Sequence, residues 1–347
     1  MTEFIQLNKE FLKPYITILN YFRCSGINIF DEKNVFIYKF KGIHYILFVL
    51  YICSTLSHTQ YVIQEVMGGT DLIELAVDLS FSFNCIEGCL LYLHFCAIKK
   101  RIKSYVMKLG KQWRDDDSLT ARSIAMKRNQ IKQIDIYTLG EFYCTLVKVF
   151  VHTYFAAPFI IILIKKFLLN IEVNYATPFK FTLPFDYQSN VFIFGSAYLM
   201  DYMIACNISY VVTCSLFFIS VTMSQLWTLF MLLQEDIREV IKSNDVDLKM
   251  KLIMSDAFGA IFAIHLVFLS VTICFYGIAA RINSRLEDLK NFLISVITTV
   301  NIYNCCRHGQ LLTDSALDIA TVAYDSAWED LSCKNKKIIL LTILRYR

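Results

Sequence analysis

The distribution of basic residues constrains this chain more than any other feature of its sequence. No Lys or Arg occurs from Gly42 to Ile98, whereas eleven occur from Lys99 to Lys132. Because moving Lys and Arg across a membrane is disfavoured, a basic segment beside an apolar one stays on the cytoplasmic side. We therefore expect two membrane spans in the first segment. They would form a hairpin that faces outward, with the N-terminus and the basic segment inside.

The apolar residues are gathered into segments long enough to cross a bilayer. Hydrophobic residues make up 56% of the 347 and charged residues 18%, and the mean hydropathy is +0.47, which is typical of a membrane protein. A helix needs about 20 residues to cross about 30 Å of hydrocarbon. The sequence thus predicts an all-α fold, a polytopic membrane helical bundle of six spans with its N-terminus inside. The expected spans are about 42–63, 72–98, 134–164, 191–233, 257–280 and 289–306.

The count of basic residues on the two sides favours this threading. It places 27 Lys and Arg inside and six outside. The segment Val191–Leu233 contains one charged residue, Asp201, and no Pro. If it formed a tight pair of spans instead of one long helix, the counts would become 20 and 13, so we expect one long helix. The sixth span is the shortest, since sixteen residues separate Lys290 from Arg307, or about 24 Å of helix.

The sequence argues against several other classes of protein. A net charge of +4 is small for this length, so nucleic acid is not an expected partner. The sequence contains no His-Glu-x-x-His, no Gly-x-Ser-x-Gly and no phosphate-binding loop, so we do not expect an enzyme. With eleven Gly and four Pro, an inverted-repeat transporter is not indicated. A G-protein-coupled receptor would need its N-terminus outside.

The twelve cysteines are expected to act chiefly as small apolar residues inside the spans. Cys85 and Cys89 are four residues apart but have no further ligand pair nearby, so we expect no metal site and no cofactor. Cys305 and Cys306 lie at the predicted inner end of the sixth span, where palmitoylation is an option.

The segment after the sixth span is predicted to stay in the cytoplasm. We divide the chain into a bundle, 1–306, and an anchor-like helical segment, 307–347. A helix is expected over Thr313–Asp330, capped by Thr313, Asp314 or Ser315. Its Tyr324 and Trp328 are four residues apart and share one face. The apolar centre of Lys334–Arg347 is too short to span, so it would lie beneath the membrane.

These C-terminal residues carry a resemblance to a known family. The sequence Cys306-Arg-His-Gly309-Gln-Leu-Leu312-Thr-Asp is followed by Ala323-Tyr-Asp-Ser-Ala-Trp328, then by Lys336-Lys337, a leucine cluster and Arg345. This order resembles the C-terminal signature of the insect odorant receptors. Leu-Pro-Phe-Asp-Tyr at 183–187 and Gln234–Glu239 resemble the family's entry to and exit from the fourth span. The match at the level of residues is specific over about 305–345.

The resemblance implies an odorant receptor subunit of a ligand-gated cation channel in the plasma membrane. It implies binding of a small volatile ligand in the outer half of the bundle, contact with membrane lipids, and assembly with a shared co-receptor. The assembly residues would be Gly309, Leu312, Tyr324 and Trp328. Family members continue past the arginine with a helix that lines the pore, whereas this sequence ends at Arg347. A truncated non-conducting receptor, or a transporter-like membrane binding protein, is therefore the alternative.

Candidate pocket residues follow from depth in the membrane, since in the family the outer halves of the second, third, fourth and sixth spans enclose the odorant site. Those outer halves are about 72–84, 150–164, 191–208 and 289–298. Aromatic walls with a few polar groups suit a small apolar ligand. The candidates are Phe81, Phe83, Phe150, Tyr154, Tyr198, Tyr202 and Phe292, with Met203 as an adaptable filler and Asp201 as a polar group. Since 15% of the chain is aromatic, lipid contact or ordinary packing is the alternative for each ring.

Polar residues inside the spans have two interpretations. Asp71, Glu74 and Asp78 share a face at the outer end of the second span, where they would contact headgroups or line a vestibule. Glu87 lies deeper and would either line a cavity or contact another helix. In the third span, Glu141 and Lys148 share a face with His152, which favours structural pairing with neighbouring helices.

Overall fold

The protein is described by a computed structural model. It describes residues 7–27, 29, 41–70, 72–137, 139–170, 177, 190–239, 250–282, 286–325, 336 and 340. Within this part the fold is entirely helical, which confirms the predicted class. The α-helices are α2 (Lys9–Cys24), α3 (Lys41–Gly68), α4 (Leu72–Lys111), α5 (Ala121–Tyr137), α6 (Leu139–Leu163), α7 (Val191–Glu239), α8 (Met250–Ile282) and α9 (Leu286–Asp325). A 3-10 turn covers Asp116–Ser118 and a π-helical turn covers Ile164–Leu168.

The long helices exceed what a bilayer requires. α7 has 49 residues without a break, about 74 Å at 1.5 Å per residue, so the prediction of one long helix from 191 to 233 is confirmed. α4 has 40 residues and continues from the predicted second span through the basic segment to Lys111. Among the described residues, three segments are both long and apolar enough to cross a membrane: Leu75–Lys111, Thr145–Leu168 and Val191–Glu235. Six crossings therefore remain a prediction.

The C-terminal boundaries differ from expectation. The predicted helix start at 313–315 is wrong, because α9 runs without interruption from Leu286 to Asp325. Thr313 Oγ1 donates to the carbonyl of Gly309 at 2.9 Å, and Asp314 accepts from Gln310 at 2.7 Å. These side chains are thus bonded within the helix and do not cap it. The proposed division at 306 falls inside α9 and stays a prediction about where the membrane ends.

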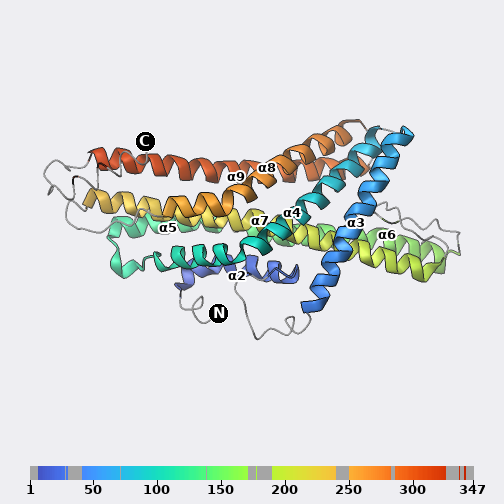
Figure 1. The fold of residues 1–347 in the computed structure, drawn as a ribbon, viewed down its shortest axis with the longest axis horizontal. Coiled ribbons are helices and arrows are strands. Elements are labelled where there is room, and N and C mark those ends of the chain that lie inside the picture. The colour runs from blue at the N-terminus through green and yellow to red at the C-terminus, as the bar shows by residue number, and fades with distance from the viewer. Residues whose placement is uncertain are drawn as a thin grey trace.

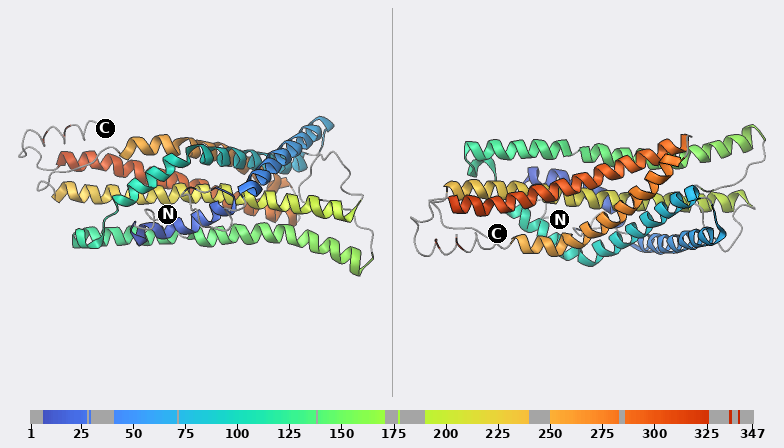
Figure 2. Two further views of the ribbon diagram at one scale, coloured as in Figure 1. Left: turned by 60° about the horizontal axis from the view of Figure 1, so that its bottom comes forward. Right: turned by 90° about the horizontal axis from the view of Figure 1, so that it is seen from above.

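The helices alternate in direction along an elongated bundle. In Figure 1, α7 and α9 run side by side along the long axis, and α8 lies against both α4 and α9. The ends of α4, α7 and α9 lie at the same end of the molecule as α5, opposite the α3–α4 and α8–α9 connections. Figure 2 shows α5 and α6 following one another in nearly one line. This alternation agrees with the predicted threading without fixing which end faces the cytoplasm.

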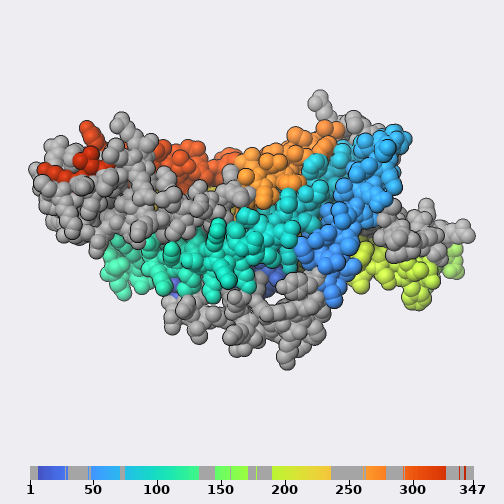
Figure 3. All heavy atoms as spheres, viewed as in Figure 1, coloured from blue at the N-terminus to red at the C-terminus, as the bar shows by residue number. Residues whose placement is uncertain are grey.

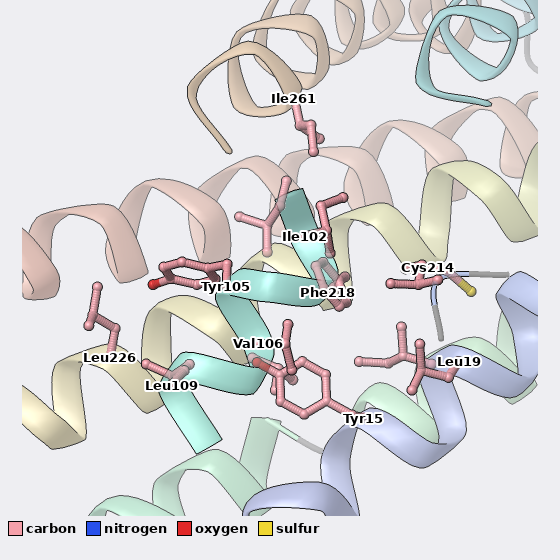
Figure 4. Packing of buried hydrophobic residues seen from close by; sticks show 14 of the residues in the cluster. Tyr15, Leu19, Ile102, Tyr105, Val106, Leu109, Cys214, Phe218, Leu226 and Ile261 are labelled. Atoms are coloured by element: carbon pink, nitrogen blue, oxygen red, sulfur yellow. The ribbon is translucent and has the colours of Figure 1, made fainter. Parts of the chain in front are cut away.

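The largest apolar core lies at the end of the bundle that carries the basic residues. It joins α2 to the second halves of α4 and α7, with contributions from α8 and α9. Figure 4 shows Tyr15 and Leu19 of α2 facing Val106 of α4 and Phe218 of α7. The sequence analysis did not predict α2 or α5. α2 begins after Asn8, whose side chain accepts from the backbone N–H of Glu10 at 2.7 Å, as an N-cap does.

Candidate functional site

An aromatic cluster joins α6 and α7 near the end of the bundle opposite the basic segment. Tyr198 is 5% exposed and its hydroxyl donates to the carbonyl of Phe155 at 2.7 Å. The ring of Phe155 lies 5.9 Å from that of Tyr198 and 5.5 Å from that of Tyr202, both edge to face. Phe194 and Phe159 complete the packing around Tyr198. Edge-to-face contacts of this kind stabilise by about 0.5–1.5 kcal/mol beyond burial.

A second cluster joins α3, α4 and the same stretch of α7. It contains Tyr51, Phe81, Cys85, Ile204 and Ile208, all buried. The hydroxyl of Tyr51 donates to the carbonyl of Cys85 at 2.6 Å, which fixes α3 against α4.

Asp201 of α7 lies between the two clusters. Successive helical residues are 100° apart, so Asp201 falls between Ala205, which packs in the α6 cluster, and Ile208, which packs in the α4 cluster. Its side chain is fully buried and lies within electrostatic range of Cys85 and Tyr198.

α8 contributes Tyr276 to the same region. Tyr276 is 7% exposed and lies within electrostatic range of Tyr154 of α6 and of Cys85 and Asp78 of α4. Phenol rings, a thiol and carboxylates from α4, α6, α7 and α8 therefore lie within electrostatic range of one another. Such a mixture of apolar walls and a few polar groups is typical of a small-molecule site.

Comparison with known proteins connects this arrangement to a family. The model of the family described as 7tm Odorant receptor matches residues 234–347. Odorant receptor 85b of Drosophila melanogaster is 22% identical over 108 residues, which are 31% of this chain and 28% of that receptor. The fold is similar to that of the insect olfactory receptor OR5 from Machilis hrabei, with 13% identity and a TM-score of 0.67 over 96% of this chain and 89% of that one. The chain is thus similar to insect odorant receptors in sequence over residues 234–347 and in fold over most of its length. A structure of the same Machilis receptor in complex with eugenol is similar with a TM-score of 0.71, at the same identity and coverage.

The predicted pocket residues do not form one group. Tyr154, Tyr198 and Tyr202 lie together at the α6–α7 contact, and Phe81 belongs to the neighbouring cluster, where it meets His58 edge to face. Phe150 is half-buried and stacks on Tyr154 of its own helix. Phe83 stacks on Phe275 between α4 and α8.

Two predicted residues lie outside this region. Met203 is 43% exposed and Phe292 is 55% exposed, so neither is enclosed by the convergence of α4, α6, α7 and α8. The sequence analysis, in turn, did not select Phe155, Phe194 or Tyr276. Depth alone does not show which rings on neighbouring helices face one another, so no signal in the sequence favoured these three over other aromatic residues.

The polar residues of the spans are used partly for helix contacts. Glu87 is fully buried, and its Oε1 lies 2.7 Å from His265 Nδ1 of α8, so the helix-contact interpretation is confirmed for it. Asn84 lies one turn before Glu87 on α4, and its side-chain oxygen accepts a hydrogen bond from Thr272 of α8 at 3.2 Å. His152 lies 5.6 Å from Tyr202, edge to face. The side chains of Asp71, Glu74 and Glu141 lie outside those described.

The residues predicted to mediate assembly have different surroundings. Leu312 is buried in the main core, whereas Tyr324 is 65% exposed at the end of α9. A Cβ atom added at Gly309 would have no neighbour within 4 Å. Trp328 lies outside the described residues. Within the described part of the chain, no three His, Cys, Asp or Glu side chains group as metal ligands would.

Proposed function

We propose that this receptor binds a small volatile ligand where α4, α6, α7 and α8 meet. The proposal is supported most directly by Tyr198, which lies within electrostatic range of the buried Asp201 and of Tyr154, and by Tyr276, which lies within range of Tyr154. The phenol rings offer apolar contact and hydroxyl groups, which suits a ligand with a ring or alkyl body and one polar group. The eugenol bound to the Machilis receptor is a small molecule of that kind.

We further propose that the receptor acts in the plasma membrane as a subunit of a ligand-gated cation channel, together with an odorant receptor co-receptor. The ligand opens such a channel only if it binds the open arrangement more tightly than the closed one. α4 packs against α7 and α8, and α6 packs against α7, so a ligand that changes the spacing of these helices can shift that equilibrium.

The test of the binding site is a set of matched variants recorded with the co-receptor. Cells expressing both chains are exposed to a panel of volatile alcohols, esters and phenols that includes eugenol, and ligand-evoked current is measured. Tyr198→Ala and Tyr276→Ala are expected to change the rank order of responses. The exposed residues Met203 and Phe292 supply controls. Met203→Ala and Phe292→Ala are expected to leave the rank order of responses unchanged. The reverse pattern would contradict the proposed site.

Recording and binding together separate the alternatives. Binding without current in the presence of the co-receptor would favour the non-conducting receptor or the transporter-like binding protein. For assembly, Trp328→Ala is expected to reduce recovery of the co-receptor in a pull-down while leaving ligand preference unchanged. Recovery equal to that of the unaltered chain would remove Trp328 from the proposed contact.

A further inference from the structure

Cys96 lies where the exposed face of α4 changes from apolar to basic. Leu90 and Leu93 on this helix are 40% and 50% exposed. Cys96 follows one turn later and is exposed. Lys100 and Arg101 follow after another turn and are also exposed. Figure 3 shows atoms of α4 at the surface of the molecule. The thiol of Cys96 therefore lies at the end of an exposed apolar surface of α4 that lipid chains can cover.

Cys306 occupies the same kind of position on α9. Val300 and Tyr303 precede it and are 48% and 62% exposed. Cys306 is exposed, whereas its neighbour Cys305 is buried. Arg307 follows directly and is exposed. The exposed face of α9 thus also changes from apolar to basic, and the accessible thiol of Cys306 lies at that change.

The two cysteines lie at one level of the bundle. The ring of Phe95, next to Cys96, lies 6.2 Å from that of Phe218 of α7. Cys305, next to Cys306, packs against Leu216 of α7, and Leu216 is two residues before Phe218. The packing thus places both cysteines at one level. The second and sixth spans are predicted to end at 98 and 306, so the sequence predicts that this level is the inner membrane boundary.

We propose that Cys96 and Cys306 are S-acylated at the inner face of the membrane. The Sγ atom forms a thioester with the acyl group of a long-chain acyl-coenzyme A, and the thiol of coenzyme A leaves with the cysteine's proton. No oxidation or reduction occurs. Both chains then enter the leaflet along exposed apolar faces of α4 and α9, and the adjacent basic residues lie at the level of the headgroups. Cysteines at such juxtamembrane positions are the usual acceptors.

Among the side chains that the structure describes, three further exposed cysteines serve as internal controls. Cys53 of α3 and Cys274 of α8 are exposed but lie inside the predicted first and fifth spans, away from the inner boundary. Cys24 ends α2, on whose exposed face Ile16 stands between the polar residues Lys13 and Asn20, so no continuous apolar surface leads to it. We expect none of these three to be acylated.

The test uses the full chain expressed in insect cells and labelled with an alkyne analogue of palmitate. In parallel, hydroxylamine-dependent exchange of thioesters for a polyethylene glycol maleimide adds one mass step for each acylated cysteine. We expect two steps for the unaltered chain, one for Cys96→Ser and one for Cys306→Ser, and none for the double variant. Cys24→Ser, Cys53→Ser and Cys274→Ser should each keep two steps.

Peptide mass spectrometry of the unaltered chain makes the result independent of how the variants fold. Acyl groups found on the peptides containing Cys96 and Cys306 would support the proposal. It would be overturned by the absence of any hydroxylamine-sensitive label. It would also be overturned by label confined to other cysteines.

Discussion

The ammonium nitrogen of Lys127 in α5 lies 2.7 Å from Oε2 of Glu10 in α2. The same nitrogen donates to Oδ1 of Asp116 at 3.0 Å and to the carbonyl of Arg114 at 2.8 Å, so its three donors have three acceptors. It also lies 5.5 Å from the centre of the Trp113 ring. With 1% of its side chain exposed, Lys127 joins α2, the turn after α4 and α5 in one contact.

Lys127→Met should lower the stability of the protein. The variant keeps the apolar stem but leaves Glu10 and Asp116 without their shared cation, at a cost of roughly 1–3 kcal/mol. The apparent melting temperature of the detergent-solubilised protein measures the change. Arg128 supplies a matched control, because it contacts the same Asp116 but is 67% exposed, and exposed pairs contribute about 0–1 kcal/mol. Equal losses for Lys127→Met and Arg128→Met would show that burial of Lys127 has no energetic consequence.

The same contact predicts a dependence on acid. The hydrogen bond from Lys127 holds the pKa of Asp116 below its ordinary value, and Arg128 adds to this effect. A carboxyl whose pKa is depressed by folding stabilises the fold above its unfolded value, about 3.9, and loses that contribution as the pH falls through its folded pKa. At pH 7 the melting temperature of the unaltered chain should be higher than that of Asp116→Asn. The difference between the two melting temperatures should narrow below about pH 4. Because Asp116 is 37% exposed, we expect a small gap. A gap that widens in acid would contradict the assignment.

α2 also depends on a glycine of α4. A Cβ atom at Gly110 would lie 2.6 Å from Leu7 Cδ1 and 2.8 Å from Phe11 Cε1. Gly110→Ala should therefore push α2 outward, cost about 1–3 kcal/mol and speed cleavage near Lys9 or Lys13 in limited proteolysis. At Gly195 of α7 a Cβ would meet nothing within 4 Å, so Gly195→Ala should be neutral or stabilise by up to about 1 kcal/mol. Unchanged proteolysis of Gly110→Ala would mean that α2 is not seated against this position.

The sequence predicted the long membrane helices better than the short peripheral ones, for a physical reason. Hydropathy over a whole span is a strong signal, and it correctly gave α7 as one helix. α2 buries Phe11, Tyr15, Ile18 and Phe22 on one face but has exposed polar residues on the other, so its mean hydropathy does not mark it. Its periodicity of three and four residues is the signal that would have identified it.

The candidate site was predicted only in part, because depth does not determine direction. Tyr202 faces Phe155, while the next residue, Met203, is turned by 100° and is 43% exposed. Tyr276 reaches the same region from α8, although the expected walls were on the second, third, fourth and sixth spans. Which faces of separate helices meet is set by tertiary packing and is not written in the local pattern of either helix.

The contact between Glu87 and His265 makes a prediction that distinguishes a pair from two independent residues. Both side chains are buried, and Oε2 of Glu87 and Nε2 of His265 have no hydrogen-bond partner in the described part of the chain. Removing one member leaves the other buried without its partner, so Glu87→Leu and His265→Leu should each cost about 3–5 kcal/mol. The double variant removes all the polar groups and should be close to the unaltered chain, since replacing a buried pair by apolar side chains is often neutral.

The apparent melting temperatures of the four proteins form a double-mutant cycle. A cycle between Glu87→Leu and Leu199→Ala is the control, because Leu199 of α7 is 60% exposed and should give additive effects. Additive losses for Glu87 and His265 as well would show that the two residues are not energetically coupled, and that the 2.7 Å contact does not hold α4 against α8.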